Sequence, residues 1–349
     1  VMYWWHTAAE RVRHGEMKRF GFITTNSLRQ TFNRRVLESH LNDSKKPLSL
    51  AFAIPDHPWV DSSDGAAVRI AMTVGAPGPL EGTRGEVVSE RTDDDSYTSV
   101  ELRKSEGILH TDLTLGANVA GATNLQANSG LSHRGVIPHG AGFVVTREQA
   151  ENLGMNTKPS LKHFFRQYRN GRDITQSPRG VLVIDTYPLG AEELKREAPP
   201  IYQWLHDRVK PERDENKRKS VRERWWRFAE PRKLLREAQA GLDRIIASPY
   251  VSKHRFFAFL PVDVLPDDGV VAITLSESHQ LGILSSRIHS IWALRAGGRL
   301  GVGNDARYNH SRCFNTFPFP DLTDAQGREI GELAERIDAH RKRQQEAHS

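Results

Sequence analysis

The stretch from Gly298 to Pro320 combines residue types that suit contact with nucleic-acid bases. A glycine-rich run leads into arginines, asparagines and an aromatic and proline ending, and the candidate contacts are Arg299, Asn304, Arg307 and Tyr308. Glycines let a backbone approach a partner closely, while arginine and asparagine offer the donors and acceptors that match base edges. The alternative is a surface turn beside core phenylalanines, and the sequence leaves both open.

The segment Gly301 to Ala306 also imitates the glycine loop that binds a dinucleotide or S-adenosylmethionine. Such a loop follows a strand and opens a βαβ unit. Here it follows a predicted helix, His279 to Leu294, so we favour a tight turn over a cofactor loop.

A second candidate lies near the start of the chain, where the apolar run from Phe20 ends in Thr24, Thr25, Asn26 and Ser27. The run is typical of a buried parallel strand, and open α/β sheets bind ligands beyond the carboxyl ends of such strands. The alternative is a strand end whose polar side chains start the next helix.

Several segments, in order along the chain, resemble the landmarks of one family. They are residues 21–27, 135–143, 179–185, 200–202, 209–213, 225–226, 251–256, 286–292 and 298–320. Together they are similar to type IIL restriction-modification enzymes, single polypeptides that cut DNA and methylate its adenines. The resemblance implies that Asn26 and Ser27 border the pocket for a flipped adenine. It further implies a target-recognition domain that binds double-stranded DNA, in which we assign phosphate contacts to Arg134, Lys253, Arg255 and Arg312.

Two motifs that methyl transfer requires in this family are missing. We find no glycine-rich loop for S-adenosylmethionine, and Pro199 and Pro200 stand between Ala198 and Ile201 instead of between a polar residue and an aromatic ring. In the family both motifs precede the position that matches Val1. The resemblance therefore implies a C-terminal portion that is inactive alone, with S-adenosylmethionine bound mainly by a missing N-terminal methyltransferase half.

Two other functions stay open. One is a non-catalytic specificity subunit that acts with a methyltransferase half in trans. The other is a structural protein without a nucleic-acid role, which would lack salt-dependent affinity for DNA.

Composition limits the remaining choices. The chain has 349 residues, a net charge of +6 and a single cysteine, which excludes an internal disulfide framework. No apolar run reaches the roughly 20 residues of a membrane span, so we expect a cytoplasmic protein. The fifteen histidines form no His-x-x-x-His pair and no Cys–His cluster, so we expect no metal site. Asp185 is interpreted as a cap, since a nuclease needs further converging carboxylates.

The segment from His206 to Arg244 is rich in arginine and lysine, with Trp225 and Trp226 among them. Acidic residues alternate with the basic ones. The segment therefore fits either a solvated helix with i,i+4 ion pairs or a surface that contacts phosphates.

The elements that position these residues indicate an α/β protein. Residues 1–76 are predicted to be the C-terminal part of a doubly wound, Rossmann-like methyltransferase sheet, with residues 49–54 and 66–74 forming a closing hairpin. Gly75 to Pro79 is the expected linker. Residues 77–320 are predicted to be a mixed α+β recognition domain, and 321–349 a helical tail. The strand from Phe20 would lie at an unpaired sheet edge.

Overall fold

The computed structural model describes residues 2–58, 68–92, 98–300 and 305–347. The chain divides into two compact units, the first ending at Ala122 and the second comprising Thr123–Leu300 and the residues from Asp305 onward. Each unit has its own sheets and its own apolar core.

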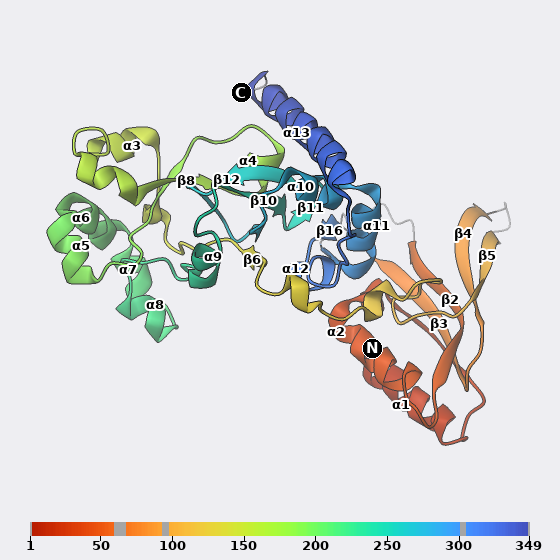
Figure 1. The fold of residues 1–349 in the computed structure, drawn as a ribbon. Helices are drawn as coiled ribbons and strands as arrows, with labels where there is room; N and C mark the ends of the chain where they lie inside the picture. The colour runs from red at the N-terminus through yellow and green to blue at the C-terminus, as the bar shows by residue number, and fades with distance from the viewer. Residues whose placement is uncertain (1, 59–67, 93–97, 301–304, 348–349) are drawn as a thin grey trace. The chain divides into compact units, whose positions relative to one another are not determined.

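Unit 1 is an α/β layer built on one five-stranded sheet (Figure 1). Its elements are α1 (Met2–Arg13), β1 (Phe20–Thr25), the 3₁₀ helix η1 (Asn26–Arg29), α2 (Thr31–Leu41), β2 (Leu48–Pro58), β3 (Arg69–Pro77), β4 (Gly82–Thr92), β5 (Thr98–Gly107) and η2 (Val119–Gly121). The strand order is β1-β3-β2-β4-β5.

The predicted hairpin is confirmed, because β2 and β3 pair in antiparallel register. The prediction for β1 needs a correction. It runs in the same direction as β2, but its direct neighbour is β3, which pairs with it in antiparallel register. Among the described strands β1 lies at the edge of the sheet, and Ile23 on this strand is 56% exposed. An apolar edge strand is therefore a feature of the fold, as expected.

The core of unit 1 lies where α1 and α2 pack against the sheet. Trp5 of α1 is 1% exposed, and its ring centroid lies 5.0 Å from that of Phe20 on β1. The Trp5 indole N–H also donates to the Thr73 hydroxyl at 3.3 Å. Leu28 and Leu37 complete the same cluster. This packing fixes the carboxyl end of β1, where Asn26 and Ser27 lie.

The boundary between the units lies after Ala122, not near residue 76. Residue 76 falls within β3, and the expected linker from Gly75 to Pro79 is the end of that strand and the following turn. The sheet continues because β4 returns beside β2, with Phe52 paired to Thr83 in parallel register. Strands β4 and β5 therefore belong to unit 1.

Unit 2 is a mixed α+β structure, as the sequence predicted, and its strands form three small sheets. Its strands are β6 (Ser132–Arg134), β7 (Val144–Val145), β8 (Phe165–Arg169), β9 (Leu182–Ile184), β10 (Arg244–Pro249), β11 (Val251–Ser252), β12 (Ala258–Pro261), β13 (Val264–Pro266), β14 (Val270–Ile273), β15 (Gly298–Leu300) and β16 (Asp305–Arg307). The sheet orders are β12-β10-β14-β6, β13-β8-β9-β7 and β11-β16-β15.

The helices of unit 2 are mostly short. They are η3 (Gln126–Asn128), η4 (Ala141–Phe143), α3 (Arg147–Asn152), η5 (Pro159–Phe164), α4 (Gly171–Thr175), α5 (Ala191–Glu197), α6 (Pro199–Arg208), α7 (Lys210–Asp214), α8 (Lys219–Glu223), α9 (Lys233–Ala238), α10 (Ser278–Ser285), α11 (Arg287–Ala296), α12 (His310–Cys313) and α13 (Asp324–Ala347). The single helix expected from His279 to Leu294 is two helices, because Ser286 is extended and its hydroxyl caps α11 by accepting from the His289 N–H.

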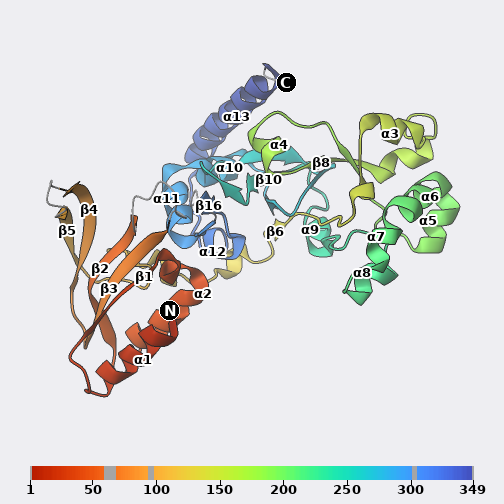
Figure 2. The same ribbon diagram turned by 180° about the vertical axis from the view of Figure 1, so that it is seen from behind.

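The C-terminal helix α13 is part of unit 2 and not a free tail. It lies beside α10 in both views (Figures 1 and 2). A Cβ on Gly282 of α10 would lie 2.4 Å from the Ile330 side chain, so glycine permits this close approach. Asp338 of α13 is 3% exposed and accepts from the Phe259 N–H at 3.2 Å.

Candidate nucleic-acid interface

The residues expected to read bases lie on the small sheet β11-β16-β15. β16 pairs antiparallel with β15 on one side and with β11 on the other, so that Arg307 lies opposite both Gly298 and Val251. Asn304 and the glycines beside it lie outside the described residues. Arg299 has its backbone on β15, opposite Ala306, but its side chain is not described. Arg307 and Tyr308 are therefore the members of this set whose side chains the structure describes.

The Arg307 guanidinium has no hydrogen bond or ion pair with the described part of the chain. Its Nε is buried without a partner, and its guanidinium carbon lies 5.1 Å from the centroid of the Tyr250 ring. The ring supports the cation through a cation–π contact while the N–H donors stay unused. The Nη groups of Arg307 form no hydrogen bond with the described residues, so they are the donors that a ligand could use.

Tyr308, the next residue, points to the opposite side. Its side chain is 0% exposed, and its hydroxyl lies 3.2 Å from Nε2 of His289. Burial raises the pKa of Tyr308, and burial lowers the pKa of His289 to about 4, so both groups are neutral. The backbone N–H of Tyr308 donates to the Tyr250 carbonyl at 2.7 Å. A side chain without exposed surface cannot contact DNA, so this structure corrects the expectation for Tyr308.

Two of the arginines expected at phosphates are bonded within unit 2. Arg255 donates to the Ser248 hydroxyl at 3.1 Å and to the Ala306 carbonyl at 2.9 Å, and burial lowers its pKa. Arg134 donates to Asp268 through two hydrogen bonds of 2.6 Å. Both cations thus brace the strands around Tyr250, and their charge is less available to a phosphate than the sequence suggested.

The other two expected phosphate contacts differ in exposure. Lys253 follows β11, is exposed, and forms no hydrogen bond or ion pair with any described residue. Arg312 is half-buried in α12, where its carbonyl accepts from the Thr316 hydroxyl. Lys253 therefore has the accessible charge that phosphate contact requires.

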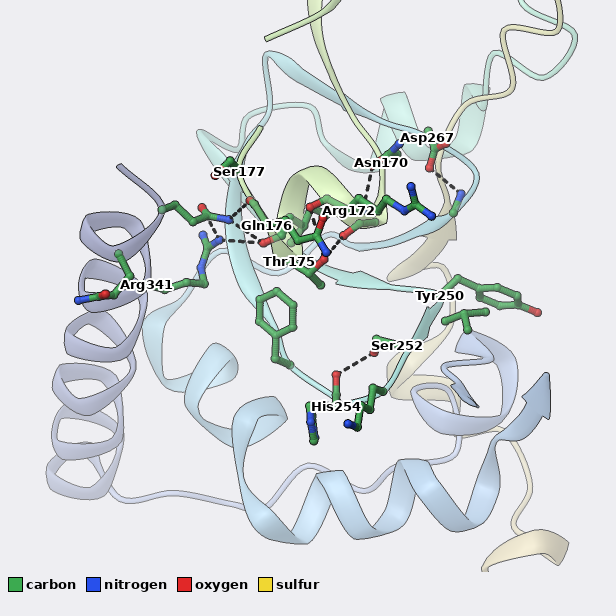
Figure 3. A pocket seen from close by; sticks show the side chains of 18 residues that line it. Asn170, Arg172, Thr175, Gln176, Ser177, Tyr250, Ser252, His254, Asp267 and Arg341 are labelled. Atoms are coloured by element: carbon green, nitrogen blue, oxygen red, sulfur yellow. Dashed lines mark hydrogen bonds between the residues drawn. The ribbon is translucent and has the colours of Figure 1, made fainter. Parts of the chain in front are cut away.

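A hollow of about 1150 Å³, with both polar and apolar side chains in its lining, opens beside this sheet (Figure 3). Residues of α4, β11 and α13 line it, among them Arg172, Tyr250, Lys253 and Arg341. Arg172 is exposed, and its guanidinium has no hydrogen bond or ion pair with the described residues. Arg172 and Lys253 thus place two unpaired cations on the same hollow, against one carboxyl group, Asp267, whose pKa burial raises.

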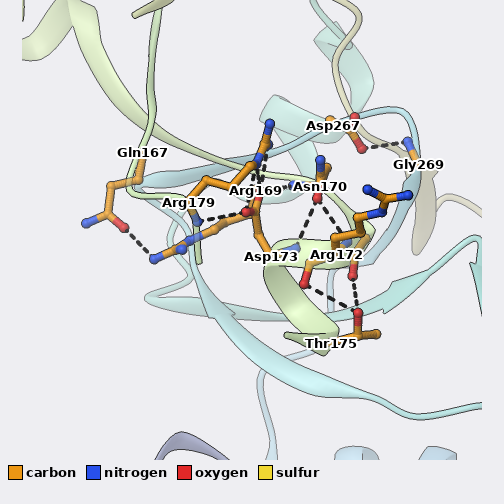
Figure 4. Close-up of polar contacts among 10 residues, drawn as sticks. Gln167, Arg169, Asn170, Arg172, Asp173, Thr175, Arg179, Asp267 and Gly269 are labelled. Atoms are coloured by element: carbon orange, nitrogen blue, oxygen red, sulfur yellow. Dashed lines mark hydrogen bonds and ion pairs between the residues drawn. The ribbon is translucent and has the colours of Figure 1, made fainter. Parts of the chain in front are cut away.

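A hydrogen-bonded network fixes the backbone that carries Arg172 (Figure 4). Asn170 caps α4 by accepting from the N–H groups of Arg172 and Asp173 at 2.9 and 3.0 Å. Asp173 is 3% exposed and accepts from Arg179 Nη2 at 2.7 Å. Burial works against the charged carboxylate, but the hydrogen bonds from Arg179 and from the backbone outweigh it and lower the pKa of Asp173.

Sequence reasoning missed Arg172, Tyr250 and the contribution of α13 to the hollow. Asn170 and Asp173 form an N-cap pattern that could have indicated a short helix at this point. Nothing in the local sequence signals that α13 comes back to this helix, where Gln345 donates to the Ile174 carbonyl at 2.9 Å.

At the carboxyl end of β1 the two expected residues are already bonded to neighbours. The Asn26 amide donates to Asp56 at 2.8 Å, and Asp56 also accepts from Arg69 at 2.5 Å. The Ser27 hydroxyl lies 2.6 Å from that of Thr25. These contacts position both side chains but do not test whether they border a base pocket.

The basic segment from His206 to Arg244 forms the end of α6, the three short helices α7, α8 and α9, and the start of β10. Arg213 is 0% exposed and donates to the carbonyls of Pro138, His139 and Val221. Lysines on three of the helices form i,i+4 ion pairs, as in Lys210 with Asp214. The structure therefore favours internal bracing and ion pairs over a phosphate-binding face. Asp185 likewise forms an ion pair with Arg236 at 2.8 Å.

Comparison with known proteins assigns this architecture to a family. Residues 125–321 match the family described as "MmeI, target recognition domain", and this match spans most of unit 2. The chain belongs to this family. Its start at residue 125 agrees with the unit boundary after Ala122.

Individual relatives extend the similarity across both units. DNA methyltransferase A of Bacillus subtilis (strain 168) is 25% identical over 319 residues, which are 89% of this chain and 34% of that protein. The structure of the type IIL restriction-modification enzyme MmeI in complex with DNA matches with a TM-score of 0.73 and 20% identity, over 98% of this chain and 44% of that one. The chain thus spans less than half the length of either relative. None of the described helices has the length and apolarity of a membrane span.

Proposed function

We propose that the recognition domain reads a DNA sequence on behalf of an adenine-specific methyltransferase of a restriction-modification system. Support comes from the family match over residues 125–321 and from the relatives, one of them a DNA methyltransferase and one solved with DNA. The partner is double-stranded DNA together with an N-terminal methyltransferase half.

The observation that carries this proposal is the group of unpaired cations around Tyr250. Arg307 keeps its donors free on the Tyr250 ring, while Arg172 and Lys253 lie on the adjoining hollow. Arg307 has the geometry for a base edge, because a free guanidinium can donate two parallel hydrogen bonds to a guanine. Lys253 and Arg172 suit phosphates, which fix the position of a protein on the duplex without reading sequence.

Two of the remaining assignments are kept and two are changed. We keep Arg299, on β15, and Asn304 as proposed base contacts. Arg134 and Arg255 act by holding the strands around Tyr250 in place, since their donors are bonded to Asp268, Ser248 and Ala306.

The described residues do not fit S-adenosylmethionine. No glycine-rich loop follows a parallel strand in the described part of unit 1. Pro199 and Pro200 start helix α6 with Ala198 as its N-cap, so no side chain there can accept from a target amino group. We therefore derive no methyl-transfer step from this chain, and the proposed role of Asn26 and Ser27 is to flank the target base.

The test is competitive binding with variants of the 349-residue chain. Duplexes are first selected from a library with a randomised core, and affinity is then measured for the selected duplex and for a scrambled one. Arg307→Ala should weaken binding to the selected duplex by about 1–3 kcal/mol and leave the scrambled duplex unaffected.

The matched control is Arg196→Ala, which removes an exposed arginine on α5 whose one ion pair with the described residues is with its neighbour Glu197 at 3.3 Å. It should change neither affinity. Equal losses on both duplexes for Arg307→Ala would contradict its assignment to a base edge.

A further inference from the structure

Helices α1 and α2 bring together three metal-ligating side chains that the proposed DNA-reading function does not use. His6 and Glu10 come from α1 and His40 from α2, and one ligand atom of each lies within 4.8 Å of the others. Nδ1 of His6 is 2.8 Å from Nε2 of His40, while Nδ1 of His40 is 3.4 Å from the Glu10 carboxylate.

The packing of unit 1 dictates this juxtaposition. Residues four apart on a helix share a face, so His6 and Glu10 point the same way from α1. His40 lies in the last turn of α2 and is 1% exposed, with its ring centroid 5.9 Å from that of Trp5. A search for paired histidines on one helix overlooks the cluster, because the second histidine comes from another helix.

We propose that His6, Glu10 and His40 bind a Zn²⁺ ion that joins α1 to α2. Two imidazoles and a carboxylate are a common zinc ligand set, with bonds of about 2.0–2.2 Å. His6 is exposed and Glu10 is 35% exposed, so the ion can enter from solvent and keep water as its fourth ligand.

Binding the ion requires a small rearrangement. Tetrahedral ligands at these bond lengths lie about 3.3 Å apart, so the two histidine nitrogens separate by roughly half an ångström. An ion binds one nitrogen of each imidazole, whereas Glu10 now faces the other nitrogen of His40. The carboxylate of Glu10 therefore turns toward His6, which its partial exposure permits.

The charges around the cluster are compatible with a cation. Arg13 lies 3.4 Å from Nδ1 of His40, but it is paired with Asp43 at 2.5 Å, and this pair does not depend on the position of Glu10.

The ion would act as a structural link beside the candidate base-pocket border. α1 and α2 flank β1 in sequence, and both pack on the cluster that holds the carboxyl end of this strand. A link between the helices would restrain this strand end. All three proposed ligands belong to unit 1, and none of them is among the proposed DNA contacts.

The experiment is calorimetric titration of the chelator-treated 349-residue chain with ZnCl₂ near neutral pH, with MgCl₂ as a second probe. We expect one equivalent of Zn²⁺ to bind and Mg²⁺ not to bind. His6→Gln changes an exposed residue and should leave the fold intact, yet weaken Zn²⁺ binding at least roughly tenfold, since even an outer-shell partner is worth 10–100-fold.

The control is His14→Gln, which removes another exposed histidine just beyond α1 and should bind Zn²⁺ like the parent chain. Thermal melts provide a second readout, in which Zn²⁺ raises the Tm of the parent and of His14→Gln but not of His6→Gln. No binding by the parent, or equal binding by all three proteins, would overturn the proposal. DNA affinity is not part of this readout, so the two proposals can fail separately.

Discussion

Replacing Asp173 by asparagine tests whether the network under Arg172 is held by charge. The carboxylate accepts from Asn170 N at 2.8 Å, from Arg179 N at 3.0 Å, and from Arg179 Nε and Nη2 at 2.9 and 2.7 Å. Asparagine keeps one acceptor oxygen but turns an amide group toward the remaining donors. Loss of about two charge-assisted hydrogen bonds predicts that the free energy of unfolding falls by about 2–4 kcal/mol.

The contribution of Asp173 to the free energy of unfolding should also depend on pH in a defined direction. The folded pKa of Asp173 lies below the ordinary value of 3.8, so its contribution to stability is complete above that value and is lost as pH falls through the folded pKa. The difference in unfolding free energy between the parent and Asp173→Asn should therefore be constant near neutral pH and shrink in acid. Urea unfolding followed by tryptophan fluorescence measures it across pH.

The matched control is Asp214→Asn, which breaks an exposed i,i+4 pair with Lys210 and should cost only about 0.3–0.5 kcal/mol. If Asp173→Asn cost no more than this control, or if its cost stayed the same at acid pH, the argument that a buried, charge-assisted network holds α4 would be refuted.

The remaining predictions concern the phosphate contacts and the edge strand. Arg172→Ala should weaken binding to selected and scrambled duplexes alike and lower the slope of log affinity against log salt by about one, measured by fluorescence anisotropy; an unchanged slope would remove Arg172 from the interface. Ile23→Lys places a charge on the exposed side of β1 and should reduce self-association of the chain in analytical ultracentrifugation, because charged residues protect edge strands from pairing. A parent chain that is monomeric at high concentration would contradict the second prediction.

Local patterns predicted the parts of the fold that depend on neighbouring residues. Two apolar runs in the sequence predicted the β2–β3 hairpin, and a third apolar run predicted the edge strand β1. The unit boundary could not be found in this way. It depends on the return of β4 to β2, a parallel pairing that no turn residue marks, while Gly75 to Pro79 imitates a linker.

For a comparable reason, local patterns did not give the directions in which the candidate site's side chains point. Arg307 and Tyr308 were expected to face DNA together, but successive side chains along an extended chain point to opposite sides. Arg307 consequently lies on the Tyr250 ring while Tyr308 enters the core beside His289. Arg172 could not be predicted, since its place depends on α4, β11 and α13 meeting at one hollow.

The most direct test of the central claim is the affinity of the 349-residue chain for selected and scrambled duplexes, measured by anisotropy at about 50 and 200 mM salt. The account predicts that both affinities fall as salt rises and that the selected duplex stays at least about 10³-fold tighter. Two results would contradict the claim that this chain reads DNA sequence. One is a selection that enriches no sequence, and the other is equal affinity for the two duplexes at both salt concentrations.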